Sequence, residues 1–147
     1  MRQEKEVTIT IPASPEYVDL IRLTLFGVAS RLKFSFEDIE DMKVAVSEAC
    51  NNAVLHAYGS EPGKIEATFV ATDSELAITV RDYGGSFDIP DHRETGGGLH
   101  GKSIDEIQSG GLGLYLMQAL MDRVEVRQED GTAVTLTKKR IKAEETA

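Results

Sequence analysis

Two polar side chains in one apolar segment are spaced so that they could meet the same ligand. Glu48 and Asn52 stand four residues apart, which places them on one face of an α-helix. Adjacent asparagines such as Asn51 and Asn52 cost roughly a few tenths of a kcal/mol each in a helix interior, so propensity does not explain them. An amide oxygen can coordinate Mg²⁺, and a carboxylate can accept a proton. The alternative is a solvated polar face with a Glu–Asn hydrogen bond, and the spacing alone leaves both open.

A second candidate carboxylate, Asp82, comes at the end of a predicted strand. Leu76, Ile78 and Val80 alternate along that strand, so Asp82 is expected on the same side as these apolar residues. A partly buried carboxylate needs a hydrogen-bond donor, and the exocyclic amine of adenine is one. Gly84 would let the backbone pass close to a flat ring. The alternative is an aspartate that starts an Asp-Tyr-Gly-Gly turn.

A glycine-rich turn at residues 109–114 precedes another predicted helix. Free N–H groups and the positive end of the helix dipole favour phosphate at such a place. The turn is not a P-loop, because no G-x-x-x-x-G-K-[ST] sequence occurs. Gly111 and Gly113 also lack the third glycine and the preceding strand of the dinucleotide fingerprint. A flexible loop with a helix-starting glycine is the alternative interpretation.

Hydrophobic periodicity predicts the elements that must position these residues. We expect Ser14 and Ser35 to cap the first two helices and Gly59 to end the second. From residue 83 to residue 111 the periodicity disappears and glycine accumulates, and a loop of this length is usually functional or mobile. The predicted strands are residues 7–11, 64–71, 75–82, 124–128 and 132–138, and the predicted helices are about residues 15–32, 36–58 and 112–121.

Strands that bracket helices, with adjacent hairpins, predict an α+β fold. We expect a two-layer α/β sandwich, with helices covering one face of a mixed, mostly antiparallel sheet. A doubly wound sheet would need more regular alternation and ranks second. The length of 147 residues predicts a single domain over 1–147, with a glycine-rich segment at about 83–111 and a charged tail at about 139–147.

Composition excludes several classes of function. The apolar fraction of 41% and charged fraction of 28% are typical of a soluble protein, and no apolar run approaches the roughly 20 residues of a membrane span. The start of the chain lacks the apolar stretch of a signal peptide, so we expect a cytoplasmic protein. A single cysteine and no Cys/His spacing argue against structural zinc. The net charge of −9 disfavours direct nucleic-acid binding and suits a protein partner with basic surface.

Taken in order, the motifs resemble those of the GHKL ATPase superfamily, over nearly the whole chain. The resemblance implies the Bergerat ATP-binding fold, with residues 83–111 as an ATP lid. It further implies that Asn52 holds Mg²⁺, that Glu48 is the catalytic carboxylate and that Asp82 binds adenine. The chain departs from the family at two positions. The family motif D-x-G-x-G ends here in Gly85-Ser86, so a serine stands where the second glycine is expected, and Ser109 stands in place of the first glycine of the family's G-x-G-x-G. The matching motifs are Glu48-x-x-x-Asn52-Ala53, Asp82-x-Gly84, Gly111-Leu112-Gly113-Leu114 and Gly131-Thr132, and the implied nucleotide contacts also include Gly84, Gly111, Gly113 and Thr132.

Within the superfamily, four segments are similar to the anti-sigma-factor serine kinases of the RsbW type. The resemblance implies binding to a stress sigma factor, phosphorylation of a serine on an anti-anti-sigma protein, and a homodimer. Two alternatives are a binding-only anti-sigma module and the ATP domain of a histidine kinase or gyrase-like enzyme. We expect the chain to be too short for the second alternative. The similar segments are Pro15-Glu16-Tyr17-Val18, Ile21-Arg22-Leu23-Thr24-Leu25, residues 44–50 and residues 111–117.

Arg22 interrupts a mostly apolar run on the first predicted helix. A charged residue among apolar ones on a helix surface is typical of a protein interface, so we expect Arg22 to contact a partner. The alternative is that Arg22 faces solvent while its neighbours fill the core.

Overall fold

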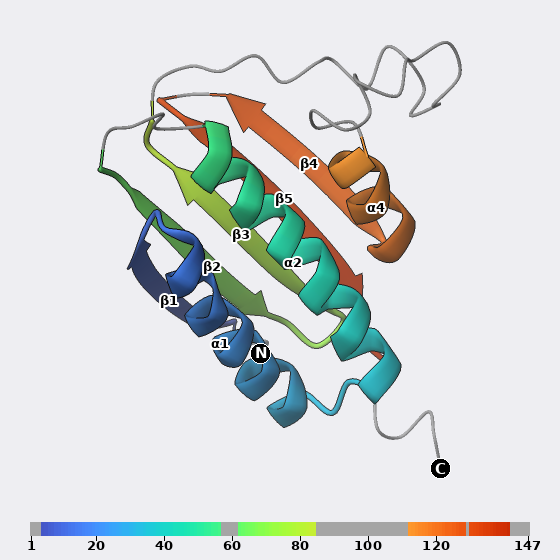
Figure 1. Cartoon of the computed structure of the whole chain (residues 1–147). Helices are drawn as coiled ribbons and strands as arrows, with labels where there is room; N and C mark the ends of the chain where they lie inside the picture. Colours follow the sequence, from blue (N-terminus) through green and yellow to red (C-terminus); the bar gives the residue numbers. More distant parts are fainter. Residues whose placement is uncertain (1–3, 57–61, 85–111, 129, 142–147) are drawn as a thin grey trace, which may run out of the picture.

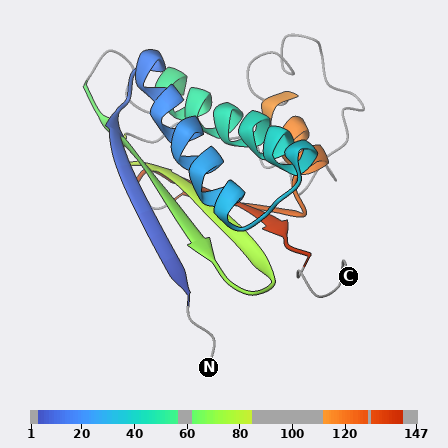
Figure 2. The same ribbon diagram turned by 90° about the horizontal axis from the view of Figure 1, so that it is seen from below.

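A five-stranded sheet and a layer of helices on one of its faces make up the computed structural model (Figures 1 and 2). The structure describes residues 4–56, 62–84, 112–128 and 130–141. The sheet order is β1-β2-β3-β5-β4, and all four pairings between described strands are antiparallel. This confirms the predicted two-layer α+β sandwich. The elements are β1 (Lys5–Pro12), η1 (Pro15–Tyr17), α1 (Val18–Arg31), α2 (Phe36–His56), β2 (Lys64–Ala71), β3 (Glu75–Asp82), α4 (Leu112–Leu120), β4 (Arg123–Gln128) and β5 (Thr132–Lys139).

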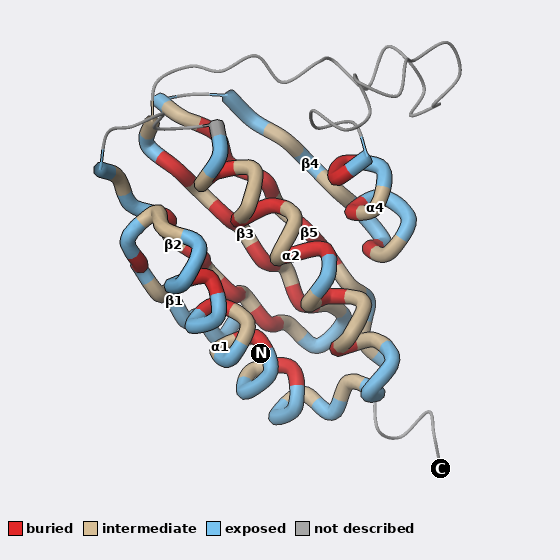
Figure 3. The backbone as a smooth tube through the Cα atoms, in the orientation of Figure 1, coloured by how far each residue is buried: buried red, intermediate tan, exposed pale blue. Residues whose placement is uncertain are grey.

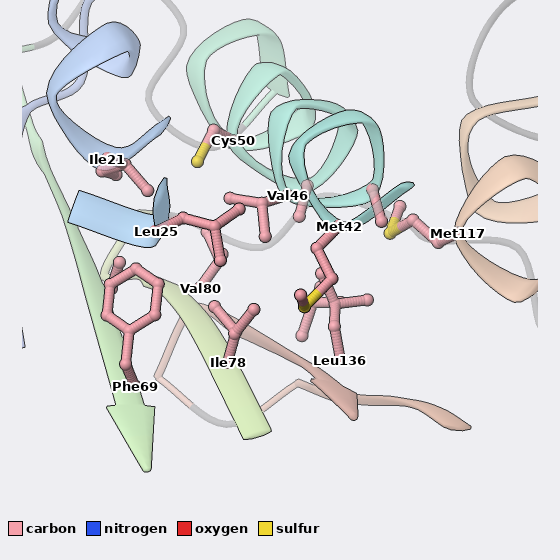
Figure 4. Close-up of a cluster of buried hydrophobic side chains, with 14 of the residues drawn as sticks. Ile21, Leu25, Met42, Val46, Cys50, Phe69, Ile78, Val80, Met117 and Leu136 are labelled. Carbon is pink, nitrogen blue, oxygen red and sulfur yellow. The ribbon is translucent and has the colours of Figure 1, made fainter. Parts of the chain in front are cut away.

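The central strands alternate between a buried and a partly exposed face. On β2 and β3 every second residue is buried, which is the burial pattern of a strand with one covered face. Figure 3 shows buried positions alternating with less buried ones along the central strands, beneath the helices. In the close-up of the core, Phe69, Ile78 and Leu136 rise from the sheet toward Val46 and Met42 of α2 (Figure 4).

Helix α2 lies in the middle of the helical layer, with α1 on one side and α4 on the other (Figure 1). The backbone N–H of Asp38 donates to Ser35 Oγ at 3.0 Å, so the predicted N-cap of this helix is confirmed. The predicted C-cap at Gly59 lies outside the described residues. Buried positions on α2 recur at helical spacing and include Ile39, Met42, Ala45, Val46, Ala49, Cys50 and Ala53.

The first helix departs from its prediction at the N-terminal end. A short 3-10 turn, η1, precedes α1, and Ser14 makes no side-chain cap to a backbone N–H. Its hydroxyl donates instead to the carboxylate of Glu16, two residues on. The predicted side-chain cap was wrong: the turn is closed by the backbone N–H of Tyr17, which donates to the carbonyl of Ser14 at 3.0 Å.

A left-handed residue turns the chain from α1 into α2. Lys33 has φ 66°, and the N–H of Phe34 donates to the carbonyl of Ala29, as in a Schellman ending. None of the helices in the described ranges has the length and apolarity needed to cross a membrane.

Candidate nucleotide-binding site

Three of the predicted site residues meet where α2 packs against the start of α4. A Cβ atom at Gly113 would lie 2.9 Å from Glu48 Oε1, 3.7 Å from Asn52 Nδ2 and 3.9 Å from Asn52 Oδ1. A carbon atom cannot approach an oxygen as closely as 2.9 Å without a shift, so a side chain at position 113 would have to move the Glu48 carboxylate from this position. Gly113 is buried, whereas Glu48 and Asn52 remain partly exposed.

Helix α4 is held so that its first turn stays beside these side chains. Leu114 and Met117 are buried in the core, and Lys138 Nζ donates to the carbonyl of Leu120 at 2.7 Å, at the last turn of the helix. The N–H groups of a first helical turn have no acceptor within the helix. Gly113 belongs to that turn, so these donors lie next to Glu48 and Asn52 and suit an anionic group. Gly111 lies outside the described residues.

Asp82 lies at the end of β3, on the face that the helices cover. It is only 3% exposed, which confirms that the alternation turns it toward the core side. The backbone N–H groups of Gly84 and Thr132 both donate to its Oδ1, each at 3.2 Å. The bond to Gly84 is the turn contact of the alternative interpretation, so Asp82 starts a turn and also faces inward. Among the described residues, no hydrogen bond reaches Oδ2.

Burial raises the pKa of the Asp82 carboxyl above its usual value, because the charged form is poorly solvated. The N–H groups of Gly84 and Thr132 and the charge of Arg81 act in the opposite direction. Asp82 is thus a desolvated acceptor whose Oδ2 receives no hydrogen bond from the described residues, and a ligand N–H can satisfy such a group.

Gly131 fixes the strand that supplies Thr132. Its φ is +108°, and a Cβ atom there would lie 2.1 Å from the carbonyl oxygen of Asp82 and 2.9 Å from Tyr83 Cα. Any other residue would therefore push the β4–β5 turn away from the end of β3. The Asp130-Gly131 hairpin was predicted, but its close approach to Asp82 was not.

The two groups of residues lie at the same end of the molecule. Figure 1 shows the C-terminal half of α2 over the end of β3 and the start of β5, with the start of α4 beside it. This half of α2 carries Glu48 and Asn52, and the strand ends carry Asp82 and Thr132. The site thus combines a buried acceptor on the sheet with a carboxylate, an amide and the first-turn N–H groups of α4.

Arg22 lies apart from these residues, on the α1 side of α2. Its Nε donates to Ser47 Oγ at 2.8 Å, and its Nη1 makes an ion pair with Asp19 on the same helix. The Arg22 side chain is 31% exposed, so it is neither free in solvent nor part of the core.

Comparisons with known proteins show the family of the chain. The model of the histidine kinase-like ATPase domain family matches residues 11–138. A serine-protein kinase RsbW of Bacillus pumilus is 50% identical over 136 residues, which cover 90% of this chain and 84% of that protein. The serine-protein kinase RsbW of Bacillus subtilis is 45% identical over 134 residues, which cover 90% of this chain and 84% of that protein. That of Halalkalibacterium halodurans is 42% identical over 139 residues, which cover 94% of this chain and 85% of that protein.

A solved structure shares the fold. The crystal structure of the RsbU and RsbW domains of a Mycobacterium tuberculosis protein matches with a TM-score of 0.66 and 22% identity. The match covers 94% of this chain and 34% of that one, so this chain corresponds to about one third of its length. The chain belongs to the histidine kinase-like ATPase family and, within it, to the serine-protein kinases of the RsbW type.

Proposed function

We propose that this protein is an anti-sigma factor that sequesters an alternative, stress-response sigma factor and uses Mg·ATP to phosphorylate a serine of its anti-anti-sigma antagonist. The names of its RsbW relatives support the kinase activity. The observation that carries the proposal is the position of Gly113 directly beside Glu48 and Asn52, which puts a proton acceptor and an oxygen ligand next to the first turn of α4. We propose one kinase domain over residues 1–147, in the cytoplasm.

The nucleotide would bind across the two groups of site residues. Asp82 would accept a hydrogen bond from the exocyclic amine of adenine, and Gly84 and Thr132, which hold its other oxygen, would fix its orientation. The first-turn N–H groups of α4 would bind phosphate oxygens, together with Gly111 at the end of the proposed lid. Guanine presents a carbonyl where adenine has its amine, so Asp82 would select against it.

Asn52 would hold the metal ion. Its amide oxygen is a hard, neutral ligand, which suits Mg²⁺ and leaves the remaining positions for phosphate oxygens and water. When bound, Mg²⁺ neutralises negative charge on the β- and γ-phosphates.

Glu48 would act on the protein substrate. The serine hydroxyl oxygen bonds to the γ-phosphorus while the bond from that phosphorus to the bridging β,γ-oxygen breaks, and ADP leaves. Glu48 orients the hydroxyl and accepts its proton as the new bond forms. A binding-only descendant would have no chemical use for a carboxylate at this place, which is why we rank the non-catalytic anti-sigma module second.

We place the partner interface on α1. Leu20, Leu23 and Phe26 expose 44%, 66% and 51% of their surface on this helix, and Arg22 lies among them. Apolar side chains around a held arginine are typical of the centre of a protein interface. The sigma factor, the anti-anti-sigma protein and a second copy of the chain are the proposed partners.

One assay tests the proposed function. The protein is incubated with γ-labelled ATP, Mg²⁺, a purified sigma factor and a purified anti-anti-sigma protein. We expect label on a serine of the anti-anti-sigma protein and a stable complex with the sigma factor. Sigma capture without any label would favour the binding-only alternative. If there is neither label nor sigma capture, both candidate functions are contradicted. Native mass spectrometry tests the proposed homodimer.

A further inference from the structure

One lysine joins the C-terminal end of α4 to the sheet and to α2. Lys138 lies on β5, and its side chain is 13% exposed. Its Nζ donates to the carbonyl of Leu120, the last residue of α4, at 2.7 Å. The same Nζ lies 4.0 Å from Oδ1 of Asp38, in the first turn of α2. A cation is stabilised at this position, because the last carbonyls of a helix carry partial negative charge.

The lysine and the proposed site lie at opposite ends of the contact between α2 and α4. Asp38 precedes Glu48 by ten residues along α2, which corresponds to a rise of about 15 Å. Leu120 follows Gly113 by seven residues along α4, which corresponds to about 10 Å. Lys138 is therefore too far from Glu48 to touch the substrate, and it can affect phosphoryl transfer only through the position of α4.

Apolar packing alone defines the position of α4 along α2 only loosely. The side chains that bury this helix and its end in the core are Leu114, Met117 and Met121. Burial of apolar surface is non-directional, and methionine adapts to small shifts of its neighbours. A hydrogen bond has a preferred distance and angle, so the bond from Lys138 restrains the last turn of α4 where packing does not.

The chain that follows α4 is also held by polar contacts with β5. The backbone N–H of Asp122 donates to the carbonyl of Thr137 at 2.9 Å, and Asp122 Oδ2 accepts from the N–H of Lys139 at 2.7 Å. These two bonds hold the residue after the helix, whereas Lys138 holds the helix itself. The C-terminal end of α4 is therefore a fixed point from which the rest of the helix extends toward Glu48.

We infer that Lys138 is a positioning residue for phosphoryl transfer: by holding the last turn of α4, it sets where the first turn of that helix meets Glu48 and Asn52. This inference rests on the proposed kinase function. A helix of nine residues moves as one rigid body, so a displacement at Leu120 is passed on to Gly113. A misplacement of about 1 Å at a reacting group can cost as much as about 10²-fold in rate.

Lys138→Met tests this inference, because methionine is also long and unbranched but has neither charge nor donor. We expect single-turnover transfer from labelled ATP to the purified anti-anti-sigma protein, per bound ATP, to slow by about tenfold. ATP affinity should fall by less than about threefold, because the proposed adenine contact at Asp82 lies on the sheet and not on α4. Lys138→Arg keeps a charged donor and should restore the rate to within about threefold of the wild type.

Lys139→Met is the matched control. Lys139 is the next residue of β5, and its exposed side chain lies on the opposite face of the strand. Its backbone N–H, which donates to Asp122, is kept in the variant. We expect transfer at the wild-type rate. Rates are divided by the amount of bound ATP, because partial unfolding lowers the number of sites but not the rate at each site.

The outcomes separate this inference from the proposed function. If the wild type transfers no label, the proposed function is contradicted. If the wild type transfers label and Lys138→Met does so equally fast at each site, only the role of Lys138 is overturned. A rate for Lys138→Arg as low as that of Lys138→Met would also overturn it, because the charged donor would not matter. If Lys138→Met does not fold, the neutral Lys138→Gln takes its place: we expect a loss of about threefold or more, and a wild-type rate overturns the inference.

Discussion

The backbone of Gly113 lies so close to Glu48 that a Cβ atom on the glycine would come within 2.9 Å of the carboxylate oxygen. Gly113→Ala should therefore displace the Glu48 carboxylate, which is the far end of a flexible, partly exposed side chain. We expect little loss in unfolding free energy, because the carboxylate can move aside, and a fall in phosphoryl transfer of about tenfold or more, because the proton acceptor is moved. Urea unfolding and single-turnover transfer from labelled ATP measure the two effects.

Gly27→Ala provides the matched control for this prediction. Gly27 lies on the exposed side of α1, and nothing lies within 4 Å of the position of its Cβ atom. The same substitution there should stabilise the protein by roughly 0.5–1 kcal/mol, because alanine is the better helix former. Gly27→Ala should leave phosphoryl transfer unchanged, and equal transfer rates for the two variants would show that an alanine at position 113 does not move Glu48.

Asp82→Asn tests the assignment of the adenine contact. Asparagine keeps an oxygen for the N–H groups of Gly84 and Thr132, so the fold at the end of β3 should persist. The amide NH₂ then stands where Oδ2 was, and it donates instead of accepting from the adenine amine, so we expect ATP affinity to fall about ten- to hundredfold and the preference for ATP over GTP to shrink. Titrations of the wild type and the variant with ATP and with GTP measure both the affinity and the preference. Wild-type affinities for both would leave Asp82 as a turn residue only.

The raised pKa of Asp82 predicts a specific pH dependence of stability. A carboxyl whose pKa is higher in the folded than in the unfolded state binds its proton more tightly when folded. Its contribution to stability therefore falls as the pH rises from the usual aspartate pKa of about 4 through the raised value. Asp82→Asn lacks this contribution. As the pH rises over the same range, the unfolding free energy of the variant should therefore increase relative to that of the wild type. A difference that stays constant from about pH 4 to pH 7 would contradict the raised pKa.

Asn52→Ala tests the metal ligand. We expect ATP affinity to fall tenfold or more in Mg²⁺ and to change little when EDTA removes the ion, because the lost amide oxygen acts through the metal. Asn51→Ala is the matched control, because Asn51 is the neighbouring asparagine on a different face of α2. The same loss with and without Mg²⁺ would mean that Asn52 does not act through the ion.

Most of the fold could be predicted from the sequence because its strands are half-buried. The apolar alternation of residues 64–71 and 75–82 matches β2 and β3 residue for residue. The cap at Ser35 was also predictable, since it depends on residues three positions apart. The cap predicted at Ser14 is absent, because the chain enters the first helix through a 3-10 turn that no local signal indicated.

Contacts between distant segments could not be predicted from local pattern. Gly113 and Glu48 lie on different helices, and Gly131 reaches Asp82 only because β5 pairs with β3. The motifs identified these glycines as candidates, but what a side chain at either position would displace is set by the packing. The bond from Arg22 to Ser47 likewise joins two helices, and the apolar pattern around Arg22 gave no sign of it.

The central claim is that Glu48 is the proton acceptor of a serine kinase, and Glu48→Gln tests it most directly. Glutamine keeps the shape of the side chain but cannot accept the proton. Single-turnover transfer from labelled ATP to the anti-anti-sigma protein should therefore slow by about 10²-fold or more, while ATP affinity and sigma-factor capture remain. Glu37→Gln, on the exposed first turn of the same helix, should transfer at the wild-type rate. Near-normal transfer by Glu48→Gln would contradict the account and reduce Glu48 to a structural partner of Gly113 and Asn52.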